Sequence, residues 1–242
     1  FAPNAVYLYT EESRFTQAMK ADLAQDGIQL RPYNQIYADL RSLAGKKTSV
    51  WMDMKRVNLA LFQSMPETAE CICKENPSVH MKAVKNPTEL ANLRDVHIDD
   101  GLAVTKFMYW LKNTMKQYEA GKEWNVTEVT AAEYLDNLRS HIPDYKELSF
   151  DTISAYGENA AMMHYHAEKD HCAVLYPRGM LLVDSGGQYL RGTTDITRTF
   201  ALGEVTAEMK KYFTLTLKGM LNLANARFLK GCTGFSLDIL AR

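Results

Sequence analysis

Hydrophobic positions in the first eighty residues alternate between short apolar runs and longer amphipathic stretches. Apolar runs of a few residues predict strands, and apolar residues that repeat every three or four positions predict helices. The elements predicted in this way are a strand over 5–9, a helix over 11–25, an extended segment from residue 28, a helix over 35–43, a strand over 49–52 and a helix over 55–63. This alternation is typical of a small α/β domain.

A charged segment with two prolines, residues 74–87, interrupts this pattern and indicates a boundary between a domain over 1–80 and one over 81–242. Asn86 and Pro87 suit the N-cap and first position of a helix. The apolar face of this helix is predicted to consist of Leu90, Leu93, His97, Gly101, Val104, Met108, Leu111 and Met115. On such a face, His97 is interpreted as a core residue rather than as a metal ligand.

The pattern beyond residue 120 mixes helices with strands. A possible capping box at 130–133 predicts a helix that ends near Ser140. Alternating positions predict strands over 149–155 and 161–165, which a turn at 157–159 joins, and His164 ends the second strand. A histidine there is ordinarily hydrogen-bonded to backbone. The remaining predictions are strands over 181–184 and 193–200, a helix over 204–230 that Gly231 ends, and a last helix from 234 whose Leu237, Ile239 and Leu240 face the core.

Two aspartates mark the predicted hairpin between the last two strands. Asp184 ends the first strand and Asp195 lies eleven positions later in the second. The intervening Gly186 and Gly187 tolerate positive φ angles, so a tight turn is predicted to bring both carboxylates to one spot. Close carboxylates repel unless one holds a proton or a divalent metal neutralises them. A metal site is one interpretation; the other is that Asp184 caps a turn and Asp195 pairs with Arg198.

Composition and charge narrow the function. The chain has 242 residues, 46% of them hydrophobic, which suits one or two globular domains with a sizeable core. A net charge of −1 gives no basis for nucleic-acid or anionic-membrane binding. No apolar run approaches the ~20 residues of a membrane-spanning helix. The four cysteines lack zinc-finger spacing and suggest no disulfide scaffold, which favours a reduced, cytoplasmic environment.

The run VDSGGQYLRGTTDITRT over 183–199 resembles the first metal-ligand hairpin of the pita-bread metallopeptidases, which include aminopeptidase P, prolidase, methionine aminopeptidase and creatinase. Its GTTDITRT portion is most similar to the aminopeptidase P branch. The resemblance implies two divalent metal ions, manganese by preference. Asp184 would bind one ion and Asp195 would bridge both.

The segment SFDTISAYGENAAMMHY over 149–165 resembles the stretch of that family whose histidine lines the active site. It implies that His164 donates a hydrogen bond to the substrate or the tetrahedral intermediate and binds no metal. Phe150 would be either a pocket wall or ordinary core. Residues 1–80 resemble the non-catalytic, creatinase N-terminal-like α/β domain of three-domain aminopeptidase P, and KAVKNPTEL resembles the family's entry into its catalytic domain.

The fold expected from the resemblance is therefore this α/β domain followed by the first half of an α+β pita-bread catalytic domain. The implied activity is removal of the N-terminal residue from peptides with proline in second position, by a homodimer when full length. Prolidase and a non-catalytic, peptide- or protein-binding relative are the alternatives. The family's remaining ligands, a histidine and two glutamates, are expected after Arg242 and an earlier domain before Phe1, so the fragment itself is expected to be inactive.

Overall fold

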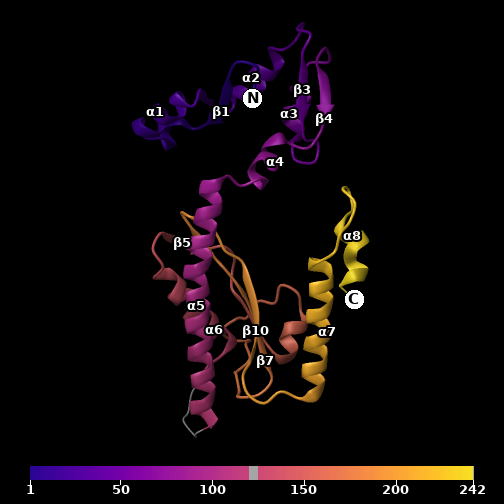
Figure 1. The fold of residues 1–242 in the computed structure, drawn as a ribbon. Coiled ribbons are helices and arrows are strands. Elements are labelled where there is room, and N and C mark those ends of the chain that lie inside the picture. The colour runs from indigo at the N-terminus through magenta and orange to yellow at the C-terminus, as the bar shows by residue number, and fades with distance from the viewer. Residues whose placement is uncertain (120–124, 242) are drawn as a thin grey trace. The chain divides into compact units, whose positions relative to one another are not determined.

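The computed structural model describes residues 1–119 and 125–241, and the chain divides into two compact units, Phe1–Lys85 and Asn86–Arg242 (Figure 1). The division falls later than the predicted boundary between residues 80 and 81. The reason is a helix, α4 (Pro77–Ala83), in the segment interpreted as an irregular linker. Asn76 caps it by accepting a hydrogen bond from the backbone N–H of Ser78 at 3.2 Å, and Pro77 takes the first helical position.

The first unit is built from two strand–helix–strand crossovers. Its elements are β1 (Val6–Thr10), α1 (Gln17–Gln25), β2 (Ile28–Pro32), α2 (Gln35–Arg41), β3 (Ser49–Met52), α3 (Leu59–Gln63) and β4 (Glu70–Cys73), with a 3₁₀ turn over Glu12–Arg14. β1 pairs with β2 and β3 with β4, both in parallel. Parallel neighbours need a crossover, which α1 and α3 provide. The predicted small α/β domain is confirmed, although β4 was not foreseen.

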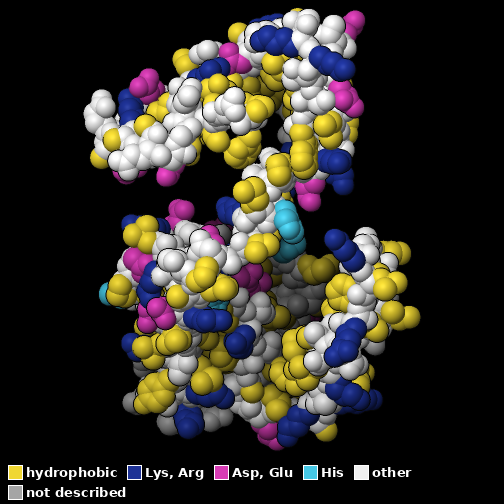
Figure 2. Space-filling model, turned by 45° about the horizontal axis from the view of Figure 1, so that its top comes forward, with side chains coloured by type: hydrophobic (Ala, Val, Ile, Leu, Met, Phe, Trp, Pro, Cys, Tyr) yellow, Lys and Arg dark blue, Asp and Glu magenta, His cyan; other side chains and the backbone are white. Residues whose placement is uncertain are grey.

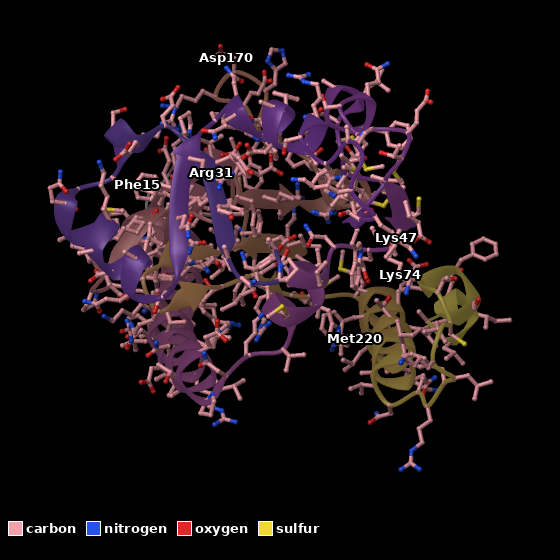
Figure 3. All side chains as sticks on the ribbon, turned by 90° about the horizontal axis from the view of Figure 1, so that it is seen from above. Phe15, Arg31, Lys47, Lys74, Asp170 and Met220 are labelled. Atoms are coloured by element: carbon pink, nitrogen blue, oxygen red, sulfur yellow. The ribbon has the colours of Figure 1, made fainter. Side chains whose placement is uncertain are left out.

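A polar cluster joins α2 to the first sheet. The Tyr9 hydroxyl donates to Asp39 at 2.7 Å, and Arg31 of β2, which Figure 3 labels, forms an ion pair with the same carboxylate. The hydrogen bond from Tyr9 and the adjacent guanidinium hold the pKa of Asp39 below its ordinary value. The Arg31 guanidinium also lies 3.6 Å from the centre of the Tyr7 ring, so one cation serves both contacts.

The second unit combines helices with two antiparallel sheets. Its elements are α5 (Pro87–Glu119), α6 (Glu128–Ser140), β5 (Tyr145–Leu148), β6 (Ile153–Tyr156), β7 (Met180–Ser185), β8 (Gly187–Tyr189), β9 (Gly192–Thr193), β10 (Ile196–Ala201), α7 (Ala207–Ala224) and α8 (Gly234–Leu237). The sheet orders are β10-β7-β6 and β5-β8-β9. The predicted strand over 161–165 is wrong, because a 3₁₀ turn (Gly157–Ala161) and a bend occupy that region.

The core of this unit lies between α5, α6 and one face of the β10-β7-β6 sheet. Figure 1 shows α5 running beside α6 and the sheet strands. The buried residues come from both helices, the sheet and the segments that flank them: Phe107, Leu111, Met115, Val126, Ala131, Leu135, Leu175, Leu181, Val183, Phe200 and Leu202. Because strand side chains alternate, burial of Leu181 and Val183 places Leu182 and Asp184 on the opposite face of β7.

The buried face of α5 differs from the predicted one over most of its length. Val96, Asp100, Ala103 and Phe107 are buried, whereas Leu90 and Met108 are exposed. His97 is exposed too, with its Nδ1 atom 2.7 Å from the Leu93 carbonyl oxygen, so its interpretation as a core residue is wrong. The prediction failed because the buried face contains a charged residue, Asp100, and hydrophobicity alone places charged residues in solvent.

The C-terminal helices expose many apolar side chains. α7 begins at Ala207, after its capping residue Thr206, and not at residue 204, and it ends at Ala224 and not near residue 230. Arg242 of the predicted last helix lies outside the described residues. Ile239 and Leu240, predicted to face the core, are exposed. Figure 2 shows hydrophobic side chains with lysines and arginines between them over this region. In the described part of the chain, no helix has both the length and the apolar character needed to cross a bilayer.

Candidate metal centre

The two aspartates lie on a long hairpin that passes from one sheet into the other. β7 pairs with β10 in the first sheet, and β8 pairs with β9 in the second. The predicted tight turn at 185–187 is absent: Gly186 joins β7 to β8, and the chain reverses at Leu190 and Arg191. Gly186 is required for close approach, since a Cβ atom there would collide with the carbonyl oxygen of Thr194.

The strand register places Asp184 and Asp195 on the same face of the hairpin. Asp184 lies opposite Thr197, whose hydroxyl donates to Asp184 Oδ1 at 2.7 Å. Asp195 precedes Thr197 by two residues, so their side chains share a face wherever the chain is extended. A diagonal pair of this kind is separated by about 7–8 Å between Cα atoms. This face is the one turned away from the α5 and α6 core.

The alternative roles of the two aspartates find no support in the described residues. Asp184 lies inside β7 and not at a turn. No ion pair joins Asp195 to Arg198 in the described ranges, and the Arg198 Nη1 atom instead donates to the Thr197 carbonyl at 2.7 Å. Asp184 is half-buried and Asp195 is exposed, so both carboxylates are left with acceptor capacity.

The chemistry of this donor pair suits a divalent cation but makes only part of a site. Carboxylate oxygens are ligands for Mn²⁺, Mg²⁺ and Zn²⁺, and one aspartate is able to bridge two ions. Thr197 fixes one oxygen of Asp184 by a hydrogen bond, as residues around metal ligands commonly do. Within residues 1–119 and 125–241, no group of three or more histidine, cysteine, aspartate or glutamate side chains is placed to hold a metal ion.

His164 is not part of the hairpin and lies in the segment that joins β6 to β7. It follows the 3₁₀ turn Gly157–Ala161 and adopts a left-handed backbone with φ +57°. The side chain is exposed, as are those of His166 and His171. Phe150 is half-buried. The structure thus brings Asp184 and Asp195 onto adjacent strands, whereas His164 comes from a separate loop.

A buried polar network lies directly behind Asp195, and sequence reasoning missed it. The Thr194 hydroxyl donates to Asp100 Oδ2 and accepts a hydrogen bond from the Gly187 N–H at 2.9 Å. The Tyr189 hydroxyl donates to the same oxygen at 3.2 Å, and Arg139 Nε donates to Asp100 Oδ1 at 2.9 Å. Burial, together with the nearby Asp100 charge, raises the pKa of Tyr189 well above its ordinary value. The backbone preceding Asp195 is therefore tied to α5 and α6.

The reversal of the hairpin is held by a second acidic residue, Asp144. Arg191 donates to this carboxylate through its backbone N–H at 3.1 Å, through Nε at 3.2 Å and through Nη2 at 3.1 Å. Its Nη2 atom also lies 2.8 Å from Asp99. These hydrogen bonds lower the pKa of Asp144 from its ordinary value of 3.8.

We expect Asp144→Asn to be less stable than the wild type near neutral pH. The folded-state pKa lies below the unfolded one, so the stabilisation is complete above pH 3.8 and is lost as the pH falls through the folded-state value. The difference between the two proteins should therefore shrink below pH 3.8. Urea midpoints measured across the acid range test this, and the exposed Asp151→Asn provides the control. A difference that does not change with pH would contradict it. Asparagine tolerates the left-handed φ of +62° at this position.

Both units match protein-family models. Residues 91–242 match the model described as metallopeptidase family M24, and residues 1–89 match the creatinase/prolidase N-terminal domain. Over 247 aligned residues the chain is 41% identical to a probable Xaa-Pro aminopeptidase P of Aspergillus flavus, covering 99% of the chain and 37% of that relative. The corresponding protein of Aspergillus niger is 40% identical, with 99% of the chain and 39% of that relative covered. The chain thus spans well under half the length of these relatives.

Solved structures share the fold. X-prolyl aminopeptidase from Caenorhabditis elegans, described as a cytosolic enzyme with a di-nuclear active site, superposes with a TM-score of 0.85 at 29% identity, over 100% of this chain and 39% of that one. An Xaa-Pro dipeptidase from Bacillus anthracis superposes with a TM-score of 0.67 at 19% identity, over 97% of this chain and 70% of that one, a likeness of fold alone. The expected fold, a creatinase N-terminal-like α/β domain followed by half of a pita-bread domain, is confirmed. The chain belongs to metallopeptidase family M24.

Proposed function

We propose that this chain contributes to an Xaa-Pro aminopeptidase, which removes the N-terminal residue from peptides with proline in second position. The observation that carries the proposal is the bent hairpin, whose register sets Asp184 and Asp195 on one face in a member of family M24. The relatives named above support the same activity, since they are described as Xaa-Pro or X-prolyl aminopeptidases.

Asp184 and Asp195 would hold two divalent ions, with Asp184 on one ion and Asp195 bridging both. Manganese is the metal proposed, because oxygen-rich ligand sets suit it. Such ions, when bound, polarise a carbonyl oxygen and lower the pKa of a water molecule. Thr197 keeps Asp184 in one rotamer through its 2.7 Å hydrogen bond, and Thr194 fixes the backbone in front of Asp195. The arrangement limits the reorganisation that metal binding would require.

His164 would donate a hydrogen bond to the oxygen on which negative charge develops during hydrolysis. An imidazole N–H placed at that oxygen stabilises the charge without proton transfer. His164 has a left-handed backbone and an exposed side chain. Within the described residues, no hydrogen bond holds its ring, so the ring is available to a substrate. A cytoplasmic location and a homodimer are the corresponding proposals for the full-length protein. The C. elegans enzyme is described as cytosolic, and sedimentation would test the dimer.

The proposal predicts that the full-length protein, loaded with Mn²⁺, releases arginine from Arg-Pro-Pro, and that a chelator stops the reaction. Chromatography of the products gives the result directly. Cleavage of a simple Xaa-Pro dipeptide but not of Arg-Pro-Pro would instead favour the prolidase alternative, whose fold the chain shares. A metal-loaded protein that binds proline peptides and cleaves neither substrate would favour the non-catalytic alternative.

A further inference from the structure

Glu128 is a fully buried carboxylate at the start of α6, and its hydrogen-bond donors come from one segment of the chain. The residue has no exposed surface. Its carboxylate accepts four close hydrogen bonds: from Tyr156 N at 2.6 Å, Asn159 Nδ2 at 3.0 Å, Tyr165 Oη at 2.8 Å and Ala173 N at 2.8 Å. All these donors lie within residues 156–173, which leave the end of β6 and contain His164.

The donor pattern requires two acceptor oxygens and not merely one polar group. Oε1 accepts from the backbone of Tyr156 and Oε2 from the backbone of Ala173, and neither N–H is able to act as an acceptor. In the described ranges no cation forms an ion pair with Glu128, so these hydrogen bonds and the N-terminal end of α6 offset its charge. Burial and the bond to Glu128 raise the pKa of Tyr165 to about 12, which keeps its hydroxyl a donor.

These anchors bracket the turn that presents His164. Asn159 lies before the turn and Tyr165 directly after His164, and Asn159 Nδ2 also donates to the Tyr165 hydroxyl at 3.1 Å. Between them Met163 is 92% exposed, so packing does not define the turn. Asp170, farther along the same segment, is exposed on a loop at the margin of the view in Figure 3. A left-handed φ at a residue other than glycine persists only where the surroundings determine it.

We propose that Glu128 is a positioning residue for His164: its carboxylate anchors Asn159 and Tyr165 on both sides of the turn and so sets the direction of the imidazole. The inference rests on the proposed function, in which His164 faces the reacting oxygen. Glu128 itself touches neither substrate nor metal, and it acts through the loop.

The first test compares Glu128→Gln with Glu133→Gln in the full-length protein. A glutamine at 128 turns an NH₂ group toward one of the two backbone N–H donors. Glu133→Gln is the same substitution at an exposed position of α6. We expect kcat of Glu128→Gln to fall about tenfold, by analogy with the loss found when groups that orient metal ligands are removed, with metal stoichiometry unchanged. Glu133→Gln should match the wild type. An unchanged kcat in Glu128→Gln would overturn the inference.

A double-mutant cycle separates positioning from a general structural effect. If Glu128 acts through His164, the Glu128→Gln change should cost almost nothing further in a His164→Ala background. Losses that multiply would overturn the inference while leaving the proposed function intact. Full activity of His164→Ala would overturn both the role of His164 and this inference. If Glu128→Gln fails to fold, Tyr165→Phe replaces it, because this change removes one anchor and no charge. We expect a smaller loss of kcat in Tyr165→Phe, and this loss should also vanish in the His164→Ala background.

Hydrogen exchange gives a measurement that does not depend on activity. Backbone amides over 157–173 should exchange faster in Glu128→Gln than in the wild type, while the strands β7 and β10 keep their wild-type rates. Equal rates over 157–173 would overturn the inference even if the protein proves to cleave no peptide. Failure of the anchor and failure of the proposed function are thereby distinguishable.

Discussion

Replacing Asp195 by alanine in the full-length protein is expected to abolish proline-peptide hydrolysis and to reduce the number of divalent ions bound. Asp195 is the proposed bridge between the two ions, so its loss removes an oxygen ligand from each. Removing groups that only support metal ligands commonly costs 10–100-fold in affinity or activity, so we expect loss of a direct ligand to exceed about a hundredfold. Isothermal titration with Mn²⁺ and the Arg-Pro-Pro assay measure the two effects.

The matched control for Asp195 is Asp95→Ala, which removes an exposed carboxylate from the same unit, on α5. It should bind metal and cleave peptide as the wild type does. An Asp195→Ala protein with undiminished metal stoichiometry would contradict the assignment of Asp195 as a ligand. Asp184→Ala should lower the stoichiometry as well, and its effect should be confined to one ion.

The largest loss of stability is expected from breaking the buried pair of Asp100 and Arg139. Both side chains have no exposed surface, and Arg139 Nη2 lies 2.9 Å from Asp100 Oδ1. Removing one partner of such a pair leaves a buried charge without compensation, which costs about 3–5 kcal/mol. We therefore expect Asp100→Asn to lower the free energy of unfolding by that amount, because Arg139 keeps its charge.

Urea unfolding of Asp100→Asn and of Arg139→Leu would measure this loss. Glu133→Gln, which removes an exposed pair with Lys169 at 3.5 Å, should leave the midpoint unchanged. A loss below about 1 kcal/mol for Asp100→Asn would show that the pair is effectively solvated. Since Asp100 also accepts hydrogen bonds from Tyr189 and Thr194, its substitution should in addition weaken metal binding at Asp195.

The sequence pattern predicted the elements that carry their own local signal. β3 and β7 are short apolar runs, and α5 begins where Asn86 and Pro87 predict it. Asn86 and Glu89 cap this helix reciprocally: the Glu89 N–H donates to the Asn86 side chain at 2.9 Å, and the Asn86 N–H donates to Glu89 at 2.8 Å. The two strands that carry Asp184 and Asp195 were also predicted in this way, whereas the role of these residues as metal ligands rests on the family resemblance and stays a prediction.

What the pattern could not predict depends on contacts between distant residues. The glycines at 186 and 187 predict a turn locally, yet the structure uses them to pass Thr194 and the Tyr189 ring at close range. Glu128 directly follows the N-cap residue Thr127 and reads as an ordinary helix-starting acid, although it binds donors up to 45 positions away. Asp100 was not among the residues predicted for the buried face of α5, because its burial depends on distant partners. The one available signal was its position four residues after Val96, which places both side chains on the same face of the helix.

The contact between Asp100 and Thr194 also has a consequence for the order of folding. The two residues are separated by 94 positions, so closing the loop between them costs considerable chain entropy before any contact compensates for it. α5 and α6 are neighbours in the sequence and precede the hairpin, so contacts between them close only a short loop. We expect the acidic hairpin to reach its final geometry only when it packs against those helices. We therefore expect the proposed metal centre to assemble late in folding, so that a nascent chain that pauses before residue 194 holds these helices without the completed acidic hairpin.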